Sequence, residues 1–195
     1  MLLELASLLI VVLTALALYF AAKKTRYTAI DYTVLGLVGV VFGVVFVPWW
    51  TAYYVVKAVG GPVVARLLTY GLWFMAAPMA AVLIRKPLSA FLGETIAALI
   101  ESLIPTAGGL TNLVYGFAQG LASEVAYAAG AYRSYGIVAS SLAGGLAAFP
   151  AVALDAVLFG DIYPWHYMVW IVLGAFVSGL IYGAIAYLVG RVVRP

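Results

Sequence analysis

The chain has 195 residues, of which 67% are hydrophobic and 9% are charged, and its formal net charge is +3. A hydrocarbon core about 30 Å thick is crossed by about 20 apolar helical residues, so this composition indicates a polytopic membrane protein with little chain left for a soluble domain. The lack of cysteine excludes disulfides, thiolate chemistry and thiol metal sites. The basic residues are used for membrane topology, and no nucleic-acid partner is expected.

Seven apolar stretches are predicted as membrane spans. The first, Leu2–Ala22, is followed by three basic residues and carries no basic segment in front. That pattern favours an uncleaved helix with its N-terminus outside over a signal peptide. Turn signals such as Gly60-Gly61-Pro62 separate the later spans. These are Asp31–Val47, Val63–Ile84, Leu88–Ile104, Leu110–Ala131, Gly136–Phe159 and His166–Val189.

The basic residues predict how the spans are oriented. If the end near Lys23 is cytoplasmic, only Lys57 and Arg66 fall outside, in a loop and at its edge. This positive-inside asymmetry predicts a multi-pass protein of the plasma membrane with an outside N-terminus and a cytoplasmic C-terminus. The inside group consists of Lys23, Lys24, Arg26, Arg85, Lys86, Arg133, Arg191 and Arg194.

The second predicted span carries a strip of small residues, Gly36, Gly39 and Gly43. Small residues let another helix approach backbone to backbone. Two interpretations stay open from the residues alone: contact with a partner subunit, and packing within the bundle.

Acidic and amide side chains are concentrated between Leu92 and Tyr127. A charge at membrane depth costs about 2.5 to 3.5 kcal/mol on insertion scales, so its default interpretation is functional. Glu94 and Glu101 are seven residues apart and therefore share a helix face, about 10 Å apart along the axis. The next span carries one polar stripe, formed by Asn112, Tyr115, Gln119 and Ser123.

The outer half of the bundle is predicted to hold a binding pocket with no buried cation. An anionic, aromatic pocket of this kind suits a cationic, ring-shaped ligand through ion pairing and cation–π contact. Its predicted polar and aromatic residues are Glu101, Asp155, Asn112, Gln119, Tyr70 and Trp73.

Three carboxylates have a structural alternative. Asp155 lies near the end of its span and is a candidate helix cap as well as a pocket residue. Glu94 and Glu124 lie in the inner half, where we interpret them as structural residues. Their expected partners are Arg85, Lys86 or Arg133 near the cytoplasmic boundary.

Several segments in chain order resemble the YkoE-type S-components, the substrate-binding subunits of energy-coupling-factor (ECF) transporters for thiamine and its hydroxymethylpyrimidine precursor. The resemblance extends over Asp31 to Val189. It rests on Tyr70-Gly71-Leu72-Trp73-Phe74, Ile84-Arg85-Lys86-Pro87, Gly93-Glu94-Thr95-Ile96-Ala97-Ala98-Leu99-Ile100-Glu101, Gln119-Gly120-Leu121-Ala122-Ser123-Glu124 and the later Leu154-Asp155.

The resemblance implies an all-α integral membrane protein with a six-helix S-component core over residues 29–195. Residues 1–28 would add an N-terminal transmembrane helix and a basic link. The core would hold thiamine or hydroxymethylpyrimidine near the outer surface, with no cofactor and no metal. The expected polar contacts are Glu101, Asn112 and Gln119, and the expected stacking residues are Tyr70, Trp73, Tyr115 and Trp170.

The resemblance also implies partners. An S-component docks on a transmembrane coupling subunit through small residues of its first core helix, which favours docking by Gly36, Gly39 and Gly43. The chain has no Walker sequence, so ATP hydrolysis is expected from partner ATPase subunits and the chain itself is not expected to be an enzyme.

Two other functions remain open. A stand-alone cation or proton-coupled transporter would use Glu94, Glu101 and Glu124 as a relay, and inverted repeats would support it, but the hydropathy pattern shows none. An intramembrane enzyme is disfavoured, because the single histidine, His166, lies beside Trp165 at the outer interface without an HExxH pair.

Overall fold

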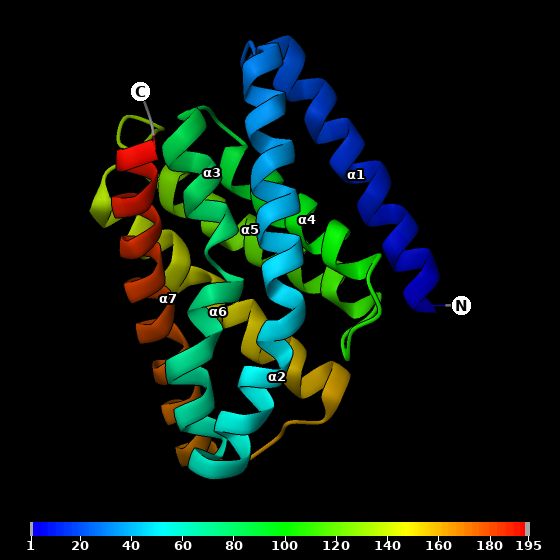
Figure 1. Cartoon of the computed structure of the whole chain (residues 1–195), viewed down its shortest axis with the longest axis vertical. Helices are drawn as coiled ribbons and strands as arrows, with labels where there is room; N and C mark the ends of the chain where they lie inside the picture. The colour runs from blue at the N-terminus through cyan, green and yellow to red at the C-terminus, as the bar shows by residue number, and fades with distance from the viewer. Residues whose placement is uncertain (1, 194–195) are drawn as a thin grey trace.

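The computed structural model describes residues 2–193, and this part of the chain contains helices and no strand (Figure 1). The all-α prediction is therefore confirmed. Four helical stretches are long and apolar enough to cross a membrane, namely Leu2–Lys24, Ala29–Ile84, Ile137–Phe159 and Trp165–Val193. The helices are α1 (Leu2–Lys24), α2 (Ala29–Trp73), α3 (Ala76–Ile84), α4 (Ser89–Ser102), α5 (Thr111–Ala129), α6 (Ile137–Phe159) and α7 (Trp165–Val193).

Helix α2 differs most from the sequence prediction. The sequence predicts an end at Val47, but the helix continues through Pro48 as far as Gly61. Gly61 has φ 76° and ψ 179°, a conformation that glycine adopts without the steric cost of a Cβ. In Figure 1, α2 descends to one end of the bundle, reverses there and returns towards α3. Residues 48–60 therefore form a helical segment at this end in place of the predicted loop.

The predicted span Val63–Ile84 is interrupted at Phe74 and Met75, between α2 and α3. Pro78 explains the break, because its ring would clash with the carbonyl group of Phe74, four residues earlier, in a continuous helix. Pro78 itself is tolerated in the first turn of α3, where backbone N–H groups have no partner within the helix. The break therefore gives α3 a free N-terminus inside the bundle.

Two glycines of the strip on α2 pack within the bundle. A Cβ on Gly39 would lie 2.5 Å from Ile96 Cγ2, and one on Gly43 would lie 2.7 Å from the carbonyl oxygen of Ala97, both on α4. The docking prediction is therefore wrong for Gly39 and Gly43, because α4 already covers them. Gly36 stays exposed, and a Cβ placed on it would have no other atom within 4 Å.

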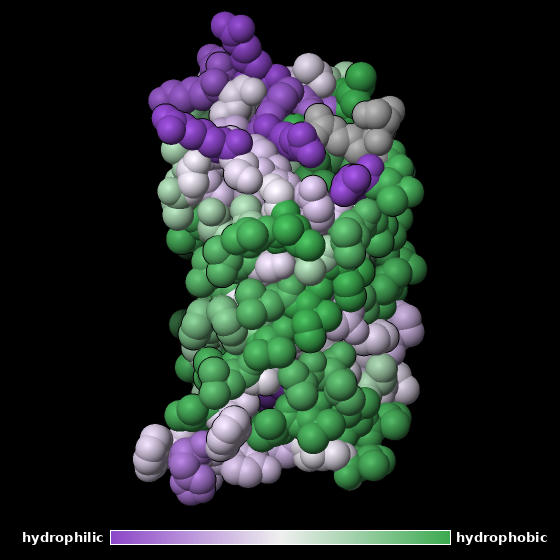
Figure 2. Space-filling model, turned by 90° about the vertical axis from the view of Figure 1, so that its left-hand side faces the viewer, coloured by the Kyte–Doolittle hydropathy of each residue, from purple (hydrophilic) through white to green (hydrophobic). Residues whose placement is uncertain are grey.

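The ends of the bundle differ in charge. The basic group lies at the α1–α2, α3–α4 and α5–α6 connections and in the last turn of α7, which all belong to the end opposite Gly61. Arg194, also predicted for this group, lies outside the described residues. In the face shown by Figure 2, hydrophilic residues gather at the top and a broad apolar belt lies below them. This distribution is that of a multi-pass membrane protein.

Candidate functional site

A cavity of about 260 Å³ lies at the Gly61 end of the bundle. Its walls come from α2, α4, α5, α6 and the α6–α7 loop, so segments far apart in the sequence meet there. The polar side chains that line it are Lys57, Glu94, Glu101, Asn112, Gln119, Asp155 and Asp161. The aromatic side chains that line it are Phe46, Trp50, Tyr53, Tyr54, Tyr70, Trp73, Phe74, Tyr115 and Phe159.

One side of the cavity is an aromatic wall formed by Trp50, Tyr53, Tyr70 and Trp73. The ring centroids of Trp50 and Trp73 are 5.1 Å apart, and those of Tyr53 and Tyr70 are 5.7 Å apart. The residues come from both limbs of α2, so the reversal at Gly61 builds this wall. The buried indole N–H of Trp73 has no hydrogen-bond partner within residues 2–193. The wall thus offers ring faces and a donor group.

Two glutamates of α4, which we call the acidic pair, line the cavity beside this wall. Glu101 is 3% exposed and accepts a hydrogen bond of 2.9 Å from Trp50 Nε1. Glu94 is 1% exposed and accepts a bond of 2.8 Å from the backbone N–H of Ala77. That N–H belongs to the free first turn of α3, where a carboxylate is favourably placed. Neither glutamate forms an ion pair with another described residue.

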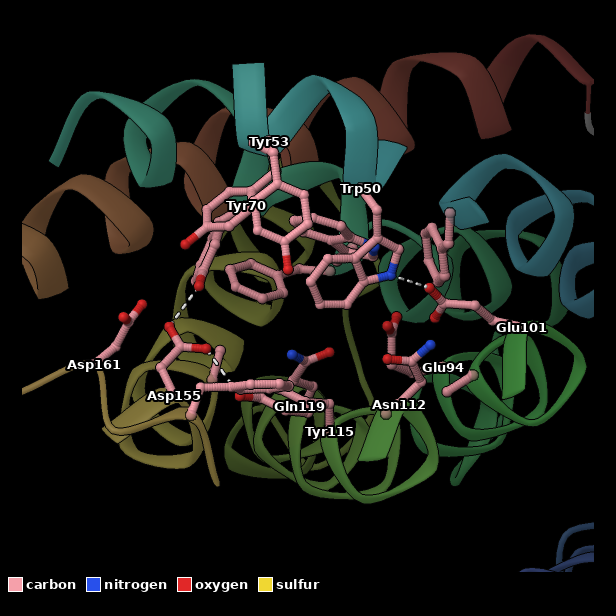
Figure 3. Close-up of a pocket in the computed structure, with 18 of the residues that line it drawn as sticks. Trp50, Tyr53, Tyr70, Glu94, Glu101, Asn112, Tyr115, Gln119, Asp155 and Asp161 are labelled. Carbon is pink, nitrogen blue, oxygen red and sulfur yellow. Dashed lines mark hydrogen bonds between the residues drawn. The ribbon is translucent and has the colours of Figure 1, made fainter. Parts of the chain in front are cut away.

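On the side away from the acidic pair, the lining residues Lys57, Asp155 and Asp161 form an ionic network with the buried Arg66. Arg66 Nη2 donates to Asp155 Oδ2 at 2.9 Å and to Asp161 Oδ2 at 2.8 Å. Lys57 Nζ lies 3.0 Å from Asp161 Oδ2. Asp155 also accepts hydrogen bonds from the hydroxyl groups of Tyr70 and Tyr115. Figure 3 shows Asp155 and Asp161 on one side, and Glu94, Glu101 and Asn112 on the other.

The network corrects the prediction of a pocket without a buried cation. The sequence assigns Arg66 to the edge of a loop, yet none of its surface is exposed. The reason is the course of α2, whose returning limb begins just after Gly61 and carries Arg66 inwards towards the end of α6. Asp155 therefore has a cation partner. Its side chain forms an ion pair with Arg66 and does not serve as the helix cap that the sequence offered as an alternative.

Asp161 lies in the α6–α7 loop, outside the helices. Burial raises the pKa of its carboxyl group, but hydrogen bonds from Arg66 and Lys57 outweigh this effect and hold the pKa below its ordinary value. Asp161 is therefore a charged member of the network at neutral pH.

The structure brings most of the predicted binding residues to one cavity. Glu101, Asn112, Tyr115, Gln119, Tyr70, Trp73 and Asp155 all line it. Asn112 also donates from Nδ2 to Thr106 Oγ1 at 3.0 Å. Trp170 is the exception: it lies on α7, is 62% exposed and does not reach the cavity, so its predicted stacking position is wrong. The rotation of α7 about its own axis turns Trp170 away from the cavity, and sequence periodicity does not determine this rotation.

The sequence prediction misses part of the lining. It ends the second span at Val47 and so leaves out Trp50, Tyr53, Tyr54 and Lys57, although their spacing of i, i+3, i+4 and i+7 is that of one helix face. That spacing is the signal that identifies them. Asp161 carries no comparable signal, because the α6–α7 loop has no regular period.

The inner carboxylates do not pair with basic residues, contrary to the prediction. Glu94 lines the cavity and caps α3. Glu124 accepts hydrogen bonds from the backbone N–H groups of Leu88 and Phe91, at 2.6 and 3.0 Å. The start of α4 has no capping side chain of its own, so Glu124 supplies this cap from α5.

The described residues contain no group of three or more His, Cys, Asp or Glu side chains that could hold one metal ion.

Three comparisons place the chain among known proteins. Residues 30–150 match a family described as the permease component of an ABC-type cobalt transport system. The putative HMP/thiamine permease protein YkoE of Bacillus subtilis (strain 168) is 32% identical over 114 residues, which cover 58% of this chain and 57% of that protein. The chain thus matches just over half of that relative's length.

The fold gives a longer match. A crystal structure of an S-component of an ECF transporter superimposes with a TM-score of 0.77 and 28% identity, covering 86% of this chain and 84% of that one. The chain therefore shares the fold of a transport S-component over most of its length. The chain belongs to the family described as the permease component of ABC-type cobalt transport systems, and its fold is that of an S-component of an ECF transporter.

Proposed function

We propose that this chain captures thiamine or its hydroxymethylpyrimidine precursor in the cavity at the Gly61 end and presents it for uptake. The observation that carries the proposal is the combination of an aromatic wall with an acidic pair that has no cation partner among the described residues. The name of the Bacillus subtilis relative supports the choice of ligand.

The chemistry of the ligands suits this cavity. Thiamine combines a positively charged thiazolium with an aminopyrimidine, and hydroxymethylpyrimidine retains the second ring. Aromatic faces stack on either ring and attract the cationic one. Carboxylates of the acidic pair can accept from the exocyclic amine, and bonds of this charge-assisted kind are among the stronger ones in proteins. Asn112 and Gln119 add amide donors and acceptors on the α5 side.

The proposal includes an arrangement in the membrane. Residues 29–193 form the six-helix S-component core and residues 2–28 add a further spanning helix, which makes seven spans. The cavity faces the outside, because the basic end of the bundle is opposite and positive residues favour the cytoplasmic side. A transmembrane coupling subunit and two ATPase domains complete the importer and supply ATP hydrolysis.

A proton relay through Glu94, Glu101 and Glu124 receives no support from the geometry. Glu94 and Glu101 line the cavity, whereas Glu124 does not. Both carboxylate oxygens of Glu124 are bound to backbone N–H groups at the start of α4.

Calorimetric titration of the purified protein with thiamine and with hydroxymethylpyrimidine tests the proposal. We expect one ligand per chain, with submicromolar affinity for at least one of them. Glu101→Gln should weaken binding more than tenfold, or more than about 1.4 kcal/mol, because the carboxylate charge is lost.

Tryptophan variants provide a matched pair. Trp73→Ala should weaken binding, whereas Trp170→Ala should leave it unchanged, because Trp170 lies on the exposed face of α7. If the folded protein binds neither thiamine nor hydroxymethylpyrimidine, the proposed function is contradicted.

A further inference from the structure

The charges around the cavity are divided unequally. In the ionic network, two cations, Lys57 and Arg66, face two carboxylates, Asp155 and Asp161, so this side is balanced. The acidic pair adds two carboxylates and has no cation of its own in the described chain. An empty cavity with both glutamates ionised would therefore carry two uncompensated negative charges.

The elements packed around the acidic pair offer it only neutral groups. Helix α3 (Ala76–Ile84) contains no titratable side chain, and it contributes the backbone N–H of Ala77. Helix α5 contributes Asn112, Tyr115, Gly116 and Gln119 to the lining. Helix α2 contributes Trp50, whose indole N–H binds Glu101, and its cations Lys57 and Arg66 are held by Asp155 and Asp161.

Two carboxylates in one largely buried site do not ionise together without penalty. Loss of hydration disfavours each charged form, and the second charge adds repulsion from the first. A proton bound by the pair relieves both effects, and so does a positive ligand. A proton and a positively charged ligand therefore compete for the acidic pair.

We propose that the acidic pair holds a proton in the empty cavity and releases it to solvent when a cationic ligand binds, so that capture of a cation is coupled to proton release. This inference rests on the proposed function, and it adds that the charge of the ligand determines whether the proton is released. A permanently cationic ligand such as thiamine displaces the proton, and its own charge takes over the compensation. A neutral ligand such as hydroxymethylpyrimidine leaves the proton in place.

Calorimetry in buffers of different ionisation enthalpy measures the protons exchanged per ligand. We expect thiamine to release about half to one proton and hydroxymethylpyrimidine to release close to none. Thiamine affinity should then rise about three- to tenfold per pH unit between about pH 6.5 and 8, with a flat profile for hydroxymethylpyrimidine. The neutral ligand serves as a control for proton exchange by groups outside the acidic pair.

Two variants test whether the released proton comes from the acidic pair. Glu94→Gln leaves Glu101 as the only carboxylate of the pair, so proton release with thiamine should fall by at least half. Glu124→Gln alters a buried glutamate outside the cavity and should leave the proton count unchanged. Both are assayed on folded protein, and the wild-type comparison of the two ligands does not depend on either variant.

The outcomes separate the inference from the proposed function. Equal proton counts for thiamine and hydroxymethylpyrimidine, with both bound, would overturn the coupling and leave the function intact. A thiamine proton count that persists in Glu94→Gln would also overturn it. If neither ligand binds, the proposed function falls, and this inference falls with it.

Discussion

Arg66 bears a positive charge with none of its surface exposed, and it reaches two carboxylates on different elements, Asp155 at the end of α6 and Asp161 in the following loop. At the scale of single residues, it is the side chain that joins the returning limb of α2 to the end of α6 and to the α6–α7 loop. Its Nε atom is also buried without a partner in the described part of the chain. Such a charge is stable only while its carboxylates remain in place.

Replacement of Arg66 should therefore be costly. Arg66→Met leaves two carboxylates without their buried partner, and breaking a buried pair in this way costs about 3–5 kcal/mol. Lys57→Met is the matched control, because the Lys57 side chain is 28% exposed and such pairs contribute about 1 kcal/mol or less. Thermal unfolding in detergent compares the two. Equal losses of stability would show that Arg66 does not have this central role.

Asp161 predicts how the ionic network responds to acid. The pKa of its carboxyl group lies below the ordinary 3.8 in the folded protein, so the folded state binds this proton less readily than the unfolded state. The stabilisation is complete above about pH 5 and is lost as the pH falls through the folded-state pKa.

Unfolding temperatures measured between about pH 7 and pH 3 test this response. The wild type should lose stability towards pH 3, and Asp161→Asn should lose less over the same interval because the titrating group is absent. Parallel curves for the two proteins would contradict the assignment.

At the scale of helices, the contact between α2 and α4 depends on glycine. A Cβ on Gly43 would lie 2.7 Å from the carbonyl oxygen of Ala97, and backbone atoms cannot move away as a flexible side chain would. Gly36, two turns earlier on α2, has open space around it. The same substitution by alanine at Gly43 and at Gly36 therefore compares a tightly packed position with an open one.

Gly43→Ala should destabilise the protein by about 1–3 kcal/mol, the range found for overpacked cores. Gly36→Ala should be neutral or stabilising by about 0.5–1 kcal/mol, because alanine is the better helix former and nothing opposes its methyl group. Unfolding in detergent measures both without any partner subunit. A harmless Gly43→Ala would mean that α2 and α4 are not in close contact.

The helices show what the sequence can and cannot predict. Apolar length and turn residues predict α1, α4, α5, α6 and α7 closely, since these features are local. The extension of α2 through Pro48 does not follow from proline rules alone, because bundle contacts override the local preference. The same extension brings Trp50 and Tyr53 into the site, although both lie beyond the predicted end of the span at Val47. The prediction for Trp170 is wrong for a related reason, since its position depends on the rotation of α7.

At the scale of the whole molecule, the site and the basic residues occupy opposite ends of the bundle. Positively charged ends stay in the cytoplasm, because translocating them across the membrane is disfavoured. In the proposed orientation the cavity opens to the outside, where a nutrient would be captured. This orientation is a prediction that can be measured directly in cells.

The natural lack of cysteine makes that measurement clean, since any introduced cysteine is the only reactive thiol. Val59→Cys places a thiol at an 88% exposed position beside the Gly61 turn, and Ser134→Cys places one on the exposed α5–α6 connection at the basic end. A membrane-impermeant maleimide added to intact cells should label Val59→Cys and spare Ser134→Cys, and disruption of the membrane should make both reactive. The reverse pattern would turn the cavity towards the cytoplasm and would remove the argument for capture from outside, while the fold and the cavity chemistry would stand unchanged.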